Sequence, residues 1–166
     1  MFYKLMICLC AVLSAAPQEK DKRMTNELVT IKTKCKGNEH CRYTGHNLFL
    51  EISITNSQPV AVGYPLAFCQ QSGPSIRLVD PQTKEEAYLK TNLADSDLKE
   101  QFTEIPPGKS IVLRWVITSA EIDQFATPLL VDILAEISLY ADINLGGKRV
   151  ETESTDTIHI TGHRLP

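Results

Sequence analysis

Apolar and polar residues alternate along much of the chain beyond Glu27. Successive side chains of a strand point to opposite faces, so this alternation predicts strands with one buried face. Asn47–Thr55 shows the pattern most clearly, and Ser110–Thr118 repeats it with apolar residues on its second face as well, which predicts a central strand. Together with Val131–Ile143, these strands predict a core that contains Leu48, Leu50, Ile52, Ile54, Ile111, Leu113, Trp115, Ile117, Ile133 and Ile137.

Shorter strands complete the pattern, and they are predicted at Leu28–Lys34, Val60–Tyr64, Ser75–Asp80, Glu85–Lys90 and Thr157–Thr161. A proline turn after Asp80 predicts that the third and fourth of these form a hairpin. Val131–Ile143 has an apolar residue at every odd position and is predicted to be a strand. Part of that segment also fits a helical stripe, which is the alternative interpretation.

Two short helical turns are predicted between strands. Asp97 and Glu100, and likewise Thr118 and Glu121, have the spacing of a capping box, in which the first side chain caps the helix and the second bonds back to it. Many short strands separated by turns are typical of a sandwich. The sequence therefore predicts an all-β, antiparallel two-sheet sandwich that forms a single domain over residues 27–166.

Two short motifs resemble parts of secreted bacterial immunoglobulin-like modules. Ile52–Asn56 followed by Gln58–Val60 is similar to their second strand and turn, and Ile105–Ser110 is similar to a proline-glycine turn before a later strand. The resemblance implies an immunoglobulin-like fold. The proline-glycine turn is also similar to that of the intracellular proteinase-inhibitor type of sandwich, which implies protease inhibition through loops as an alternative function.

The first 16 residues have the layout of a secretory signal peptide. Lys4 precedes an apolar run from Leu5 to Leu13, and small residues follow. This run is shorter than the roughly 17 to 25 residues that span a bilayer. We therefore expect a secreted or periplasmic protein with cleavage near Ala16, a flexible lead-in over residues 17–26, and no stable membrane insertion after cleavage.

Cys35, Cys41 and Cys69 follow the predicted leader. In an oxidising compartment, three cysteines allow one disulfide and one free thiol. Cys35 and Cys41 are the nearest pair in sequence and flank a polar turn, so they are the expected disulfide. Pairing of Cys69 with either of them is the alternative.

A metal site is the second interpretation of the same cysteines. Cys35, His40, Cys41 and His46 carry ligands that zinc and copper prefer, which predicts a metal-binding secreted protein as an alternative function. Their spacing departs from that of structural zinc sites, and adjacent residues of an extended chain point apart. A disulfide with surface histidines is therefore preferred, and no metal or cofactor is expected.

Charge and motifs limit the remaining functions. The chain has 17 Lys and Arg against 20 Asp and Glu, a net charge of -3, and no basic stripe in the sequence, so nucleic acid is not an expected partner. Nucleophilic catalysis needs a Ser or Cys with a histidine base, and phosphate binding needs a glycine loop followed by a lysine. Neither pattern occurs, and we expect a non-enzymatic module.

One segment combines aromatic and flexible polar residues. Loops on a rigid sandwich are common recognition sites. The candidate binding loop contains Tyr64, Phe68, Gln70, Gln71 and Gly73. Its alternative interpretation is a core strand that contains Leu66 and Phe68. The expected partner is a protein or a glycan.

Overall fold

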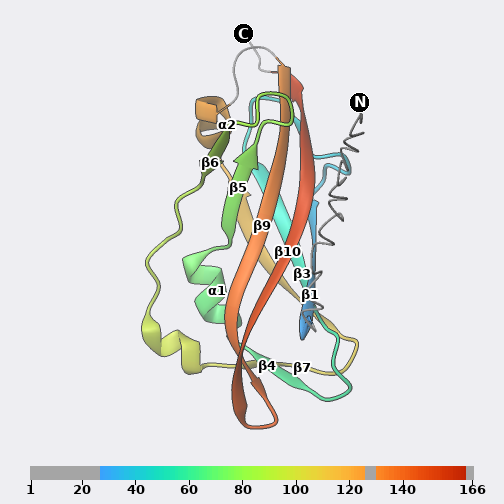
Figure 1. Cartoon of the computed structure of the whole chain (residues 1–166), viewed down its shortest axis with the longest axis vertical. Coiled ribbons are helices and arrows are strands. Elements are labelled where there is room, and N and C mark those ends of the chain that lie inside the picture. Colours follow the sequence, from blue (N-terminus) through green and yellow to red (C-terminus); the bar gives the residue numbers. More distant parts are fainter. Residues whose placement is uncertain (1–26, 126–129, 164–166) are drawn as a thin grey trace, which may run out of the picture.

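The computed structural model describes residues 27–125 and 130–163 (Figure 1). The predicted signal peptide and lead-in lie outside the described residues, and so do residues 126–129 and 164–166. The described chain is rich in strands, as the alternating pattern predicted. Within it, every helix falls short of the length and apolar content that crossing a bilayer requires.

The smaller sheet contains β1 (Val29–Cys35), β3 (Leu48–Asn56) and β8 (Ser110–Ile117) in the order β1-β3-β8. All of its pairings are antiparallel. The prediction that Ser110–Thr118 is a central strand is wrong, because β8 lies at the edge of this sheet. Its second face is open: the Val112 side chain on it is 43% exposed, and Arg114 is exposed on the same face.

The larger sheet is built on a long hairpin of β9 (Leu130–Leu145) and β10 (Lys148–His163), which confirms a strand at Val131–Ile143 (Figure 1). β10 begins well before the predicted start at Thr157. β4 (Val62–Tyr64), β5 (Ser75–Val79), β6 (Glu86–Tyr88) and β7 (Thr103–Ile105) join antiparallel on the β9 side, and β5 and β6 form the predicted hairpin. β2 (Arg42–Tyr43) pairs in parallel with β10.

The core lies between the two sheets. Every predicted core residue is buried except Ile111 and Trp115, which are half-buried. Both lie on the edge strand β8, where no further strand covers them in the described part of the chain. A strand pattern reports which face is apolar and not how far the next layer extends, so it overestimates burial at Ile111 and Trp115, whereas Leu113 and Ile117 of the same strand are fully buried.

Within residues 27–125 and 130–163, three short helical segments connect the strands, namely α1 (Leu66–Ser72), the 3-10 helix η1 (Ser96–Glu100) and α2 (Ser119–Phe125). The Thr118 capping box before α2 is confirmed: the Thr118 amide donates to Glu121, and the Glu121 amide donates to the Thr118 hydroxyl. The predicted cap of η1 is wrong by two residues, because the Asp95 side chain accepts from the Asp97 amide.

Candidate functional site

The candidate binding segment lies in a gap beside β9. β4 pairs with β9 at Asn144 and Leu145, whereas β5 pairs with it from Leu134 to Ser138. The chain between β4 and β5 therefore forms no strand beside the intervening part of β9. It forms the helix α1 there instead. The prediction of a flexible loop is wrong for these residues, and so is the alternative of a core strand at Phe68.

Tyr64 and Cys69 of this segment are buried. The Tyr64 side chain is 1% exposed, and its hydroxyl accepts from the Cys69 thiol at 3.7 Å. Burial raises the pKa of both groups, because it penalises the phenolate and the thiolate. Cys69 is the free cysteine of the described residues, and its surroundings keep it a neutral, structural thiol.

The two glutamines are engaged within the protein. Gln70 accepts from the Arg114 amide at 3.1 Å and donates to the Arg114 carbonyl at 2.6 Å. Gln71 accepts from the Asp95 amide at 3.1 Å. Gly73 ends the helix at φ 80° and ψ 166° beneath the Trp115 ring. These contacts fix α1 to β8 and to the loop before η1.

Phe68 and Pro65 line one side of a groove of about 560 Å³ that we call the acidic groove. Its other side is the β9–β10 hairpin. The lining residues are Pro65, Phe68, Lys99, Tyr140, Ala141, Asp142, Glu151, Thr152 and Glu153. The volume lies within the usual range of ligand pockets, roughly 300 to 1,000 Å³.

Negative charge dominates this groove. Asp142 and Glu151 lie directly opposite each other on neighbouring strands, where like charges repel. A hydrogen bond to Glu153, the residue opposite Tyr140, raises the pKa of the Tyr140 hydroxyl. Lys99 is the cation of the lining, and its ammonium lies 4.9 Å from the centre of the Phe68 ring. The groove thus offers an aromatic wall and several carboxylate acceptors.

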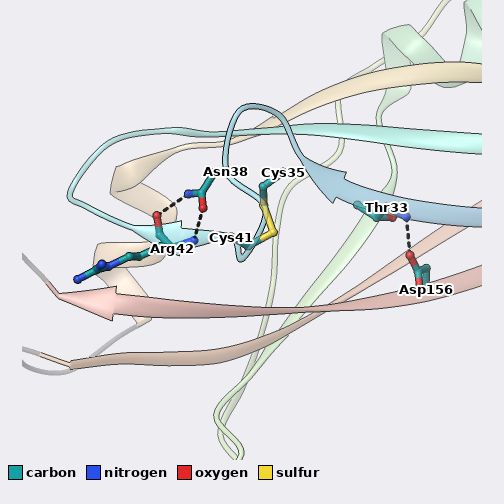
Figure 2. Close-up of a disulfide and its surroundings, with 6 residues drawn as sticks. All are labelled: Thr33, Cys35, Asn38, Cys41, Arg42 and Asp156. Carbon is teal, nitrogen blue, oxygen red and sulfur yellow. Dashed lines mark hydrogen bonds between the residues drawn. A yellow bond between two sulfur atoms is a disulfide. The ribbon is translucent and has the colours of Figure 1, made fainter.

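The predicted disulfide is present between Cys35 and Cys41 (Figure 2). Asn38 closes the turn between them by donating to the Arg42 carbonyl and accepting from the Arg42 amide. Disulfide sulfurs are not thiolates. The alternative metal site of Cys35, His40, Cys41 and His46 therefore loses two of its four ligands while this bond is intact. The side chains of His40 and His46 are exposed nearby.

The other two histidines lie near the end of β10. The ring of His159 contacts the Asp132 carboxylate at 2.5 Å, and both His159 and His163 are exposed. Among the described residues, no cluster of three or more His, Cys, Asp or Glu side chains has a geometry suited to a metal ion.

Sequence reasoning missed the residues of β9 and β10 that line the acidic groove. Tyr140 and Asp142 occupy even positions of β9, opposite in phase to its buried odd positions. The alternation therefore marked them as outward-facing. Only the β9–β10 register brings Glu151 and Glu153 beside them, and that register depends on the turn after Leu145.

Comparisons with known proteins add little to this geometry. No family model and no curated protein matches the chain. Among solved structures, a Northeast Structural Genomics Consortium target designated SoR45 is similar with a TM-score of 0.39 and 8% identity over 79% of this chain and 86% of that chain.

β-Glucosidases from Erythrobacter marinus and Listeria innocua each give a TM-score of 0.36 and 11% identity. The matches cover 80% and 82% of this chain but only 15% and 17% of the glucosidases. Similarities this low carry no argument about fold or function.

Proposed function

We propose that this chain is a non-enzymatic interaction module that is exported and binds a protein or glycan partner at the acidic groove. The observation that carries the proposal is the groove itself, in which the Phe68 and Tyr140 rings lie beside the carboxylates of Asp142, Glu151 and Glu153. Aromatic faces supply apolar contact area, and carboxylates accept charge-assisted hydrogen bonds. The groove is therefore suited to a ligand that presents amines or hydroxyls.

Export and an immunoglobulin-like arrangement of the sheets belong to the same proposal. The Cys35–Cys41 disulfide supports export, because such bonds persist mainly in oxidising compartments. Two sheets enclosing one core support the sandwich arrangement. On such a scaffold the rigid sheets position the groove, and binding needs no conformational change.

The test is direct titration with two defined probes, a blocked lysine-rich heptapeptide and a chitosan oligosaccharide, followed by backbone NMR. We expect the amides of residues 140–142 and 151–153 to shift on saturable binding of at least one probe. Glu153→Gln should weaken that binding about two- to fivefold, the range for an exposed ion pair. Glu85→Gln is the matched control, because it removes the same charge from the exposed turn between β5 and β6.

Two results would contradict the proposal. The first is an equal loss of affinity in both variants, which would show that only net charge matters. The second is the absence of saturable binding by either probe.

A further inference from the structure

The outer edge of β8 lacks a neighbouring strand in the described part of the chain. β8 pairs with β3 along one side only. On the other side, the Gln70 side chain bonds to both the amide and the carbonyl of Arg114. In an antiparallel ladder, a residue of the neighbouring strand makes these same two hydrogen bonds, one to the amide and one to the carbonyl of its partner. The Gln70 side chain therefore takes the place of one residue of a neighbouring strand.

The direction of the backbone groups alternates along β8, so the direction at Arg114 determines which other backbone groups face the outer edge. Because the Arg114 backbone groups point away from β3, those of Val112 and Val116 point the same way. Open edges of this kind pair readily with other extended chains, and proteins usually protect them. Here α1 lies against the edge and covers its centre through Gln70, with a valine on each side.

A hollow of about 340 Å³ adjoins this edge, and its walls include Phe49, Trp115 and Val116. The Phe49 side chain is 55% exposed, which is unusual for a large apolar residue on a strand. Lys36 and Arg114 also line the hollow. It can therefore receive an apolar side chain next to a negatively charged one.

The charge of the outer face of this sheet indicates which kind of segment binds at the edge. Lys32, Lys34, Lys36 and Arg114 are exposed on or beside the outer face of this sheet. The Glu51 carboxylate already contacts Lys34 at 3.2 Å and Arg114 at 3.8 Å. The face is thus basic on a chain whose net charge is -3. Charge complementarity favours an acidic occupant.

We propose that the β8 edge binds an extended, acidic segment of a partner protein by adding it as a fourth strand to the smaller sheet. Strand addition takes its affinity from backbone bonds and its specificity from alternate side chains. The added strand places apolar residues beside Val112 and Val116 and an acidic residue beside Arg114. Gln70 must release Arg114 and α1 must move away from the edge for this to occur, because α1 lies against β8 where a paired strand would run about 4.8 Å away. The β8 edge belongs to the smaller sheet, but α1 carries both Gln70 and Phe68, so movement of α1 at this edge also alters the wall of the acidic groove.

The probe is a blocked heptapeptide, Thr-Val-Thr-Glu-Thr-Val-Thr, whose central glutamate faces Arg114 in antiparallel pairing. Trp115 is the single tryptophan of the chain and lines the hollow, so its emission reports binding at this site. We expect a saturable change in emission, together with slowed hydrogen exchange at the Val112 and Val116 amides. The Leu113 and Trp115 amides face β3 and serve as internal controls.

Modified probes separate backbone pairing from charge attraction. N-methylation of the two valines blocks the bonds to β8 and should abolish binding, whereas N-methylation of the outer threonines should not. Replacing the glutamate of the probe with lysine should lower its affinity for the natural protein several-fold. The Arg114→Glu variant should bind this lysine probe with the affinity that the natural protein has for the glutamate probe.

Protein variants test the role of Gln70 and of the edge. Gln70→Ala frees the Arg114 backbone and should tighten binding by about fivefold, the order expected when two exposed hydrogen bonds no longer compete. Val112→Pro removes an N–H from the open side of an edge strand, where proline is tolerated, and should abolish binding. The N-methylated probes give the same information if that variant fails to fold.

Three results would overturn the proposal. Binding that is equal for both N-methylated probes would show attraction to the basic face without strand addition. A dimer of the free protein that Val112→Pro dissociates would make a second copy of the chain the occupant. No change in emission or exchange for the natural protein and for Gln70→Ala would show that the edge is closed to peptides.

Discussion

At the scale of single residues, Gly73 determines how closely α1 approaches β8. Its φ of 80° and ψ of 166° belong to a region that side chains disfavour. A Cβ at this position would overlap the Trp115 ring. The Gly73 amide also donates to the Cys69 carbonyl at 3.0 Å and so closes the helix. Backbone conformation and close packing therefore both require glycine here.

Gly73→Ala should lower the free energy of unfolding by about 3 kcal/mol, because backbone strain and overpacking each cost about 1 to 3 kcal/mol. Gly108→Ala is the matched control: its φ of 67° is also positive, but nothing lies within 4 Å of the added Cβ. We expect about 1 kcal/mol there. Urea unfolding followed by circular dichroism measures both. Equal losses would show that contact with Trp115 contributes nothing.

At the scale of elements, the turn between β1 and β2 is held by the disulfide and by Asn38 (Figure 2). Cys41 has a positive φ of 47°, an uncommon conformation for a residue other than glycine. The disulfide side chains are buried and belong to the core. The cross-link thus joins the two ends of a tight turn, and the side chains at both ends are packed in the core.

Replacing both Cys35 and Cys41 with alanine, which adds no polar group to this buried site, should cost at least about 2 kcal/mol of stability, the value for closing a loop this short. The reason is that the unfolded chain regains conformations that the cross-link excludes. Chemical unfolding with and without reductant checks this result. Reductant should destabilise the natural protein and leave the double variant unchanged, and a reductant effect on the variant would contradict the explanation.

At the scale of the whole molecule, the two sheets are joined where β1 meets β10. The Thr33 amide donates to the Asp156 carboxylate at 2.5 Å, and the Ser154 hydroxyl donates to the Val29 carbonyl at 2.6 Å. Side chains of the larger sheet thereby satisfy the backbone at the edge of the smaller one. The larger sheet covers this edge, whereas a side chain of α1 covers the centre of the β8 edge.

Asp156→Ala should lower the free energy of unfolding by about 1 to 3 kcal/mol, because the Thr33 amide loses its acceptor in a partly buried site. Ser154→Ala removes the second contact, and a double-mutant cycle measures the coupling between them. Thr157→Ala, at an exposed position of the same strand, is the control and should change little. Strictly additive losses in the cycle would argue against a joint role in holding the sheets together.

The sequence by itself determined the features that depend on near neighbours. The alternation at Leu48–Asn56 and Leu130–Leu145 follows from the geometry of one strand, and it located most of the core correctly. The Thr118 capping box and the Cys35–Cys41 pair join residues only a few positions apart. For such features, local chain geometry restricts the partners.

Only the tertiary structure decided which strand ends a sheet, where α1 lies and which side chains form the acidic groove. Alternation cannot reveal that β8 has one neighbour, because an edge strand and a central strand bury the same face. Leu66–Ser72 is helical where β4 and β5 leave a gap along β9, and that gap exists only once distant strands have paired. The long-range register of those strands places carboxylates from β9 and β10 beside Phe68, which no local pattern encodes.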